Sequence, residues 1–138
     1  MSRWTCPRCD REFGRAHQAH TCVPGGTVDE TFAGRAAWQR EAYDRIEEHI
    51  TSLGPVHVDA VGVGVFLKSD RKLAEIRPMA RSLTLYLMLP YGLDHARVTR
   101  TLRLTEGRIM NVVRLTQLAD VDDTLRAWLT VAYDAATA

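Results

Sequence analysis

All three cysteines of this chain and two of its five histidines fall within residues 6–22, CPRCDREFGRAHQAHTC. Two residues separate Cys6 from Cys9, a spacing that lets two thiolates face one ion. Zinc takes Cys and His ligands in tetrahedral sets of four. The segment has few apolar residues, so metal ligation rather than burial must order it. We therefore expect a zinc-binding knuckle over residues 1–23.

Two further ligands must come from His17, His20 and Cys22. Side chains two apart, such as His20 and Cys22, can converge in a turning segment, whereas His17 and His20 suit a helical turn. We predict the set Cys6, Cys9, His20 and Cys22, with His17 as a substitute. Four protein ligands are typical of structural zinc, because catalytic zinc usually keeps a position for water. The alternative is three free cysteines beside solvated histidines.

A standard DNA-reading zinc finger does not fit this segment. Phe13 stands where such a finger has its aromatic residue, four residues after Cys9. The usual twelve-residue spacing from Cys9, however, leads to Cys22 rather than to a histidine, and no second histidine follows it closely.

The breaker cluster Pro24-Gly25-Gly26 predicts a linker over residues 24–28, followed by a domain over 29–138. A first helix is expected from Asp29 to Leu53, capped by Thr27 or Asp29 and stopped by Gly54-Pro55. Its apolar residues recur at helical steps: Phe32, Ala36, Tyr43, Ile46, Ile50 and Leu53. A last helix capped by Asp122 should place Trp128 and Tyr133 on its buried face.

Between these helices the pattern predicts consecutive strands. One or two strands are expected over 56–68, a pair over 72–77 and 82–89, and a hairpin over 98–104 and 108–115 that turns at 105–107. Runs of strands without alternating helices favour an α+β fold. We expect a largely antiparallel sheet flanked by the N-terminal and C-terminal helices, with the helices on one face.

Composition limits the classes of protein to consider. The chain has 138 residues, of which 46% are hydrophobic and 25% charged, as in globular domains. A net charge of +1 gives no overall argument for nucleic acid or a membrane. We find no apolar run of about 18–20 residues and no signal peptide, so we expect a cytoplasmic protein with no membrane partner. Clustered cysteines in the cytosol favour metal over disulfides.

The N-terminal segment resembles a known zinc-binding segment, which we call the head. The residues Cys6-Pro7-x-Cys9-x-Arg11-x-Phe13, followed by Gln18-x-His20-x-Cys22, are similar to the zinc-binding head on some members of the bacterial domain of unknown function 5655. His17 departs from that pattern, since a small polar residue is typical there.

The rest of the chain resembles the same family in its opening helix with Tyr43, the strand end Leu87-x-Leu89-Pro90 and the last helix after Val121-Asp122-Asp123. The similarity covers roughly residues 4–22 and 38–135. Residues 61–65, VGVGV, depart from it, because a strand start containing Lys-Thr is typical there. The family has no established activity, so the resemblance implies the architecture and the zinc but no task.

Basic residues concentrate in the predicted hairpin, opposed only by Glu106. Such a patch could hold phosphate and bind nucleic acid, although a solvated sheet face whose arginine stems cover apolar surface is the simpler explanation. In a hairpin, Arg97 and Arg103 would share one face and Arg100 the other. The candidate anion-binding residues are Arg97, Arg100, Arg103, Arg108 and Arg114.

No catalytic residues are predicted. The sequence has no nucleophile paired with a base, no phosphate-binding Gly loop with Lys and no His-Glu-x-x-His. His57 and His95 are isolated. We expect a zinc-binding, non-catalytic binding module that engages nucleic acid or another protein. The alternative is a structural or homo-oligomeric interaction protein with a purely structural zinc, and an uncharacterised enzyme comes third.

Overall fold

The structure is a computed structural model that describes residues 3–22 and 25–137. A small N-terminal head contains two short strands, β1 (Trp4–Thr5) and β2 (Glu12–Phe13). The body begins with α1 (Val28–Phe32) and α2 (Ala37–Leu53) and ends with a 3-10 turn (Leu118–Asp120) and α3 (Asp123–Ala136). Between them lie six strands: β3 (His57–Val61), β4 (Gly64–Lys68), β5 (Lys72–Pro78), β6 (Leu83–Leu89), β7 (Val98–Thr105) and β8 (Arg108–Leu115).

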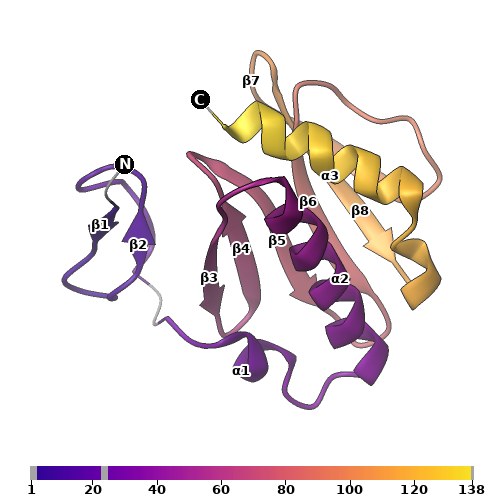
Figure 1. Ribbon diagram of the computed structural model, residues 1–138, viewed down its shortest axis with the longest axis horizontal. Coiled ribbons are helices and arrows are strands. Elements are labelled where there is room, and N and C mark those ends of the chain that lie inside the picture. Colours follow the sequence, from indigo (N-terminus) through magenta and orange to yellow (C-terminus); the bar gives the residue numbers. More distant parts are fainter. Residues whose placement is uncertain (1–2, 23–24, 138) are drawn as a thin grey trace.

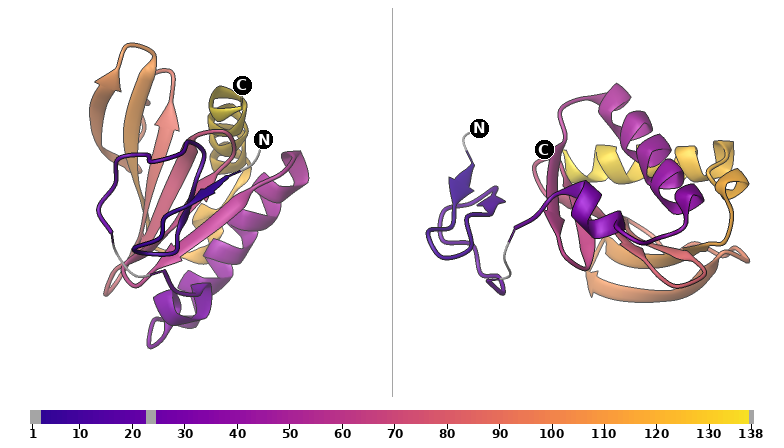
Figure 2. Two further views of the ribbon diagram at one scale, coloured as in Figure 1. Left: turned by 90° about the vertical axis from the view of Figure 1, so that its left-hand side faces the viewer. Right: turned by 90° about the horizontal axis from the view of Figure 1, so that it is seen from below.

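The six strands form one antiparallel sheet in the order β3-β4-β5-β6-β8-β7. Helices α2 and α3 lie together on one face of this sheet (Figure 2). The other face, which we call the open face, carries no helix among the described residues. The predicted α+β class and the placement of the helices are confirmed. The hairpin turns at Gly107, whose φ of 77° suits a residue without a Cβ.

The core lies between the helices and the inner face of the sheet. Strand residues alternate, so every second side chain of β4, β5, β6 and β8 faces the helices. Fully buried members are Ile46 and Ile50 of α2, Leu125 and Leu129 of α3, and Leu67, Ile76, Leu85, Leu87 and Val113 of the sheet. This core holds the strands in place, and it therefore also sets the positions of the side chains on the open face.

The single helix predicted from Asp29 to Leu53 is wrong, because the structure has two helices here. Thr27 and Glu30 form a capping box that starts α1, and α1 ends at Phe32. Gly34 then takes a φ of 75°, and α2 begins at Ala37. Spacing alone missed this break, because Phe32 and Ala36 are apolar and four residues apart, as they would be in one continuous helix.

Trp128 packs against the margin of the core, on the helix face that its spacing predicted, but it is not fully buried. It is half-buried, its ring lies edge-on to His95 with 5.0 Å between centroids, and the Arg97 guanidinium stands 5.6 Å from its centre. Tyr133 is buried as expected, and its hydroxyl donates to the carbonyl of Pro55 at 3.1 Å. Within residues 3–22 and 25–137, no helix combines the length and apolarity that crossing a membrane requires.

The predicted linker joins the head to the sheet edge. Pro24 lies outside the described residues. Gly25 bridges Val61, and the N–H of Gly26 donates to Ala60 O at 2.9 Å, so this segment runs beside β3. The boundaries 1–23, 24–28 and 29–138 stay predictions, but the head lies beside the β3–β4 end of the sheet (Figure 1).

Candidate metal centre

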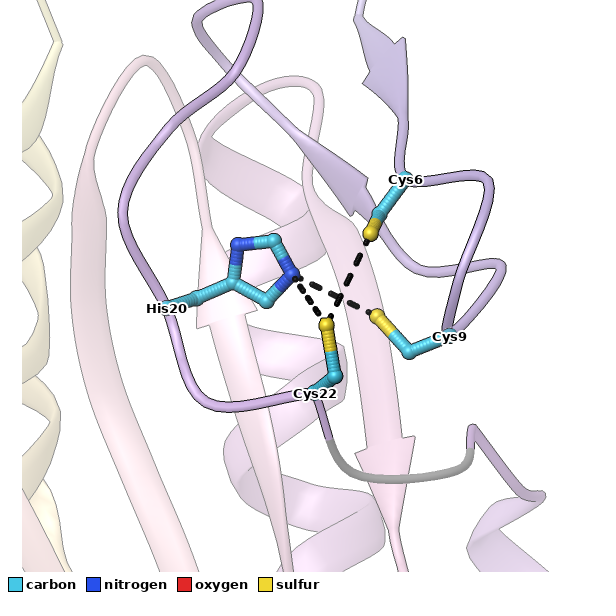
Figure 3. A group of neighbouring side chains, drawn as sticks. All are labelled: Cys6, Cys9, His20 and Cys22. Carbon is cyan, nitrogen blue, oxygen red and sulfur yellow. Dashed lines mark hydrogen bonds between the residues drawn. The ribbon is translucent and has the colours of Figure 1, made fainter.

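Four side chains of the head converge on one point (Figure 3). The ligand atoms of Cys6, Cys9, His20 and Cys22 all lie within 4.8 Å of one another. Cys6 Sγ is 3.8 Å from Cys22 Sγ, and His20 Nε2 is 3.4 Å from Cys9 Sγ and 3.5 Å from Cys22 Sγ. These are the four residues predicted from the sequence, and together they could hold a metal ion.

A tight turn between β1 and β2 presents the first two thiols. The N–H of Asp10 donates to Cys6 O at 2.8 Å, and the N–H of Cys6 donates to Arg11 O at 2.9 Å. Asp10 takes a φ of 61°, a conformation that Asp adopts more readily than most residues. Cys6 and Cys9 are buried by this fold of the backbone, with Phe13 and Trp4 packed against them.

The ring of His20 is held so that Nε2 faces the cysteines. Its Nδ1–H donates to the carbonyl of Gln18 at 2.6 Å, and since a carbonyl only accepts, the proton is on Nδ1. Nε2 is then left with its lone pair toward the thiols, which is the arrangement usual for a ligating histidine. The ring also stacks on Phe13, with 4.0 Å between centroids.

His17 lies elsewhere in the head. Its ring packs against Trp4 with 5.1 Å between centroids, and it is not among the four side chains that converge. Its φ of 56° places it in the turn before His20. The structure therefore brings His20, and not the substitute His17, to the cysteines.

The pKa values of the Cys6 and Cys22 thiols are shifted in opposite directions. Burial raises the pKa of Cys6, but hydrogen bonds from the N–H groups of Cys9 and Arg8 and from neighbouring side chains outweigh it and lower the pKa to about 6. Burial and the adjacent thiols of Cys6 and Cys9 raise the pKa of Cys22. Three thiolates this close repel one another, so a bound cation would stabilise the cluster.

A buried ionic contact joins the head to the sheet. Arg11 from the head donates through Nη2 to Asp59 Oδ2 at 3.0 Å, and Lys68 Nζ donates to the same oxygen at 2.8 Å. The side chains of all three are at most 10% exposed. Burial opposes ionisation of Asp59, but the two cations hold the pKa of its carboxyl below its usual range. We call Arg11, Asp59 and Lys68 the clamp.

Sequence reasoning missed the clamp. Asp59 and Lys68 belong to neighbouring strands, β3 and β4, and both point to the open face, where the head covers them. Arg11 was noted only as part of the head motif. The alternation of His57 and Asp59 with apolar neighbours over 56–60 was a signal that one face of β3 is not apolar.

The five hairpin arginines do not share one face. Arg103 pairs with Ile109 and Arg100 with Val112, so the two project from opposite sides of the sheet. Arg97 instead binds Asp122 at the start of α3, with Nη2 2.8 Å from Oδ2. The opposite faces of Arg100 and Arg103 are those that strand alternation predicted, and the bulges at Val98/Arg100 and Arg103/Thr105 change the alternation only toward the two ends of β7. On the open face, Arg108 lies beside β5 and donates to Lys72 O at 2.9 Å.

The fold and the site define a class: an α+β domain, with two helices over one face of an antiparallel sheet, that bears a Cys3His head. The chain belongs to the family described as Domain of unknown function (DUF5655), whose family model matches residues 28–136. The head precedes the matched range. No curated protein and no solved structure matches the chain.

Proposed function

We propose that this chain is a zinc-dependent, non-catalytic binding module, in which the zinc orders the head and the head completes a binding surface on the open face. The observation that carries the zinc assignment is the spacing of the four ligand atoms. A tetrahedral ion with zinc–sulfur bonds of about 2.3 Å and zinc–nitrogen bonds of about 2.0–2.1 Å sets sulfur–sulfur edges of about 3.8 Å and sulfur–nitrogen edges of about 3.5 Å. Three of the six separations are close to these edges, at 3.8 Å for Cys6–Cys22, 3.4 Å for Cys9–His20 and 3.5 Å for Cys22–His20, and all six lie within 4.8 Å.

A structural role fits the donor set better than a catalytic one. Four protein ligands fill a tetrahedral zinc ion and leave no position for water or substrate. The isolated histidines also have local partners: His57 Nδ1 lies 3.4 Å from Glu12 Oε2, and the His95 ring packs on Trp128. Thiolate ligands persist best in a reducing compartment, so the proposal includes a cytoplasmic location.

The binding surface is the part of the open face next to the head. The head does not swing free on its linker, because the clamp fixes it to β3 and β4 and Arg3 Nη2 donates to Ser69 O at 2.8 Å. Because the metal orders the head and the head lies against the open face, the metal also fixes the shape of the surface that the two form together. Nucleic acid or another protein would be the partner.

The metal content of purified protein tests the proposal. We expect about one zinc per chain in protein purified without added metal, lost in Cys6→Ser and Cys9→Ser. His20→Ala should also release zinc, while the matched variant His17→Ala should keep it, because its ring faces Trp4. Zinc-free wild-type protein, or equal loss from both histidine variants, would contradict the ligand set.

Hydrogen exchange tests whether the zinc is structural. Chelation should remove amide protection across Cys6 to Cys22, because burial in so small a head cannot offset about 1–2 kcal/mol of backbone entropy for each ordered residue. Strand β6 should stay protected, since its inner face packs in the core. Loss of protection in β6 as well would show that head and body unfold as one unit.

A second candidate, an oligomer built on the edge of the sheet, has one observation in its favour. Strand β7 is one of the two edge strands, the other being β3, and its Leu102 and Leu104 are 48% and 44% exposed. The same strand carries bulges near both ends and the exposed Arg100 and Arg103, which are devices that discourage edge pairing. We therefore rank the oligomer second, and light scattering at two concentrations would detect it.

A further inference from the structure

A groove of about 770 Å³ runs between the head and the open face of the sheet. One wall comes from the head and includes Arg15 and His20, and the floor and far wall come from β4, β5 and the start of β8. Eight cationic side chains line it. The metal cluster and the groove therefore share His20, and the head wall exists only while the head is folded.

Positive charge in the groove is not balanced by its carboxylates. Asp59 neutralises part of the charge of Arg11 and Lys68, and Glu75 lies between Lys72 and Arg77. Asp70 is the third carboxylate at this site. Eight cations against three carboxylates leave a strong positive excess in a concave surface, where the field is focused.

The cations crowd one another. Burial, and then the positive charge of Arg71, lower the pKa of Arg108. Burial also lowers the pKa of Lys68, and among the nearby charges Arg11 and Arg3 act in the same direction, against Asp59. A bound polyanion would relieve this repulsion. Another cavity, of about 880 Å³ between the head and β3, has no such excess, because Asp10, Glu12, Glu30 and Asp59 all line it.

An aromatic ring lies among these cations. Phe66 is half-buried on the groove floor, with Lys72 Nζ 5.0 Å and the Arg11 guanidinium 5.3 Å from its ring centre. Val63, at the tip of the β3–β4 hairpin, is 63% exposed on the rim. A basic groove with a half-buried ring on its floor suits a flexible chain of phosphates whose bases can stack, whereas a rigid duplex would not bring its bases to the floor.

We infer that this groove binds single-stranded nucleic acid, with phosphates held by Arg15, Arg71, Arg77 and Arg108 and a base on Phe66. The inference rests on the proposed function, because the zinc-ordered head supplies one wall. It assigns a site different from the hairpin patch expected from the sequence, with Arg108 as their shared residue.

Fluorescence anisotropy with a labelled twelve-nucleotide oligothymidylate and the zinc-loaded full chain tests the inference. We expect binding at 50 mM NaCl, with log K falling against log salt at a slope of about −3, since each of four phosphate contacts contributes about −0.7. Duplex DNA of the same length should bind at least fivefold more weakly. No binding, or tighter binding of the duplex, would overturn the inference.

Matched variants locate the site. The triple variant Arg15→Gln, Arg71→Gln and Arg77→Gln should lose at least tenfold in affinity. A control with the same charge change outside the groove, Arg35→Gln, Arg45→Gln and Arg81→Gln, should lose less than twofold, because these residues are exposed and do not line it. Equal losses would show that only net charge matters and would overturn the assignment of the groove.

The variant Phe66→Leu distinguishes stacking of a base on the ring from unspecific binding of any polyanion. We expect about fivefold or greater loss for the oligothymidylate, as stacking is worth about 1–3 kcal/mol per base, with binding of a heparin fragment unchanged. If the oligothymidylate affinity does not change and heparin competes as well as the oligonucleotide, the partner is not a nucleic acid. Zinc measured on the same samples separates the outcomes: zinc-loaded protein that does not bind contradicts this inference alone, and zinc-free protein contradicts the proposed function.

Discussion

The clamp makes Asp59 the residue on which docking of the head depends. Its carboxylate lies between Arg11 and Lys68, and its side chain is 5% exposed. Asp59→Asn keeps the size of the side chain but leaves two cations facing each other without a counter-charge. Removing one partner of a buried ion pair costs about 3–5 kcal/mol. Arg11 can escape into water if the head leaves the sheet, so we expect the cost to appear mainly as undocking.

A loss of about 3 kcal/mol lowers the docking constant on the order of 100-fold. Zinc affinity, measured by competition with a chromophoric chelator, should fall as well, because the docked state favours the folded head. The amide of Gly26, which donates to Ala60 O in the docked state, should lose protection from hydrogen exchange. Circular dichroism should show the body still folded.

The control is Asp44→Asn, which removes an exposed carboxylate that pairs with Arg40 on α2. It should change zinc affinity by less than about twofold, since exposed pairs contribute about 0.2–1 kcal/mol. Adding Arg11→Met to Asp59→Asn should recover part of the loss, because it removes one of the two facing cations. Unchanged zinc affinity and unchanged Gly26 protection in Asp59→Asn would refute the reasoning.

Three further predictions concern the body. Trp128→Ala should cost about 1.5–2.5 kcal/mol in urea unfolding, below the 3–5 typical of a fully buried Trp, because its ring is only half-buried; a cost above 4 would place it in the core. Gly54→Ala should destabilise by about 2 kcal/mol or more, since a Cβ there would clash with the Tyr133 hydroxyl, and Tyr133→Phe should rescue part of that loss. Asp122→Ala should cost about 1–2 kcal/mol, because its side chain accepts from the N–H of Leu125 and caps α3. Burial opposes ionisation of Asp122, but this N–H and the Arg97 guanidinium outweigh it and hold the pKa of the carboxyl below its usual value. The contribution of Asp122 to stability is therefore present above about pH 4 and is lost as the pH falls further. Asp122→Ala should lack this loss of stability in an acid titration.

Local patterns were sufficient to predict much of the body. Asp122 at the start of α3 and Gly107 in the β7–β8 turn act through their own neighbours in the chain, so their roles follow from sequence. The four residues of the metal cluster could also be chosen from spacing, because all of them lie within one short segment.

Features that depend on distant partners could not be predicted in this way. The clamp needs Arg11 to meet Asp59 across 48 positions of sequence, and the groove needs Arg15 from the head and Arg108 from β8 to lie on the same cavity. No periodicity encodes such meetings. The break at Gly34 was missed for a different reason: the glycine was outweighed by apolar spacing that continues on both sides of it.

The order of the last two strands has a consequence for how the chain folds. Strand β8 lies between β6 and β7, although β7 comes first in the sequence. After β6 the chain must therefore skip the position beside β6, form β7 one place further out, and return to fill the skipped position with β8. The β7–β8 hairpin can form from its own tight turn, but it reaches the sheet only when β8 aligns along β6 from Leu83↔Leu115 to Leu89↔Ile109. Closing that longer loop is slower than forming the hairpin. Until β8 docks, the outer edge of β6 has no partner strand, and there a second unfolded chain could compete for the place of β8.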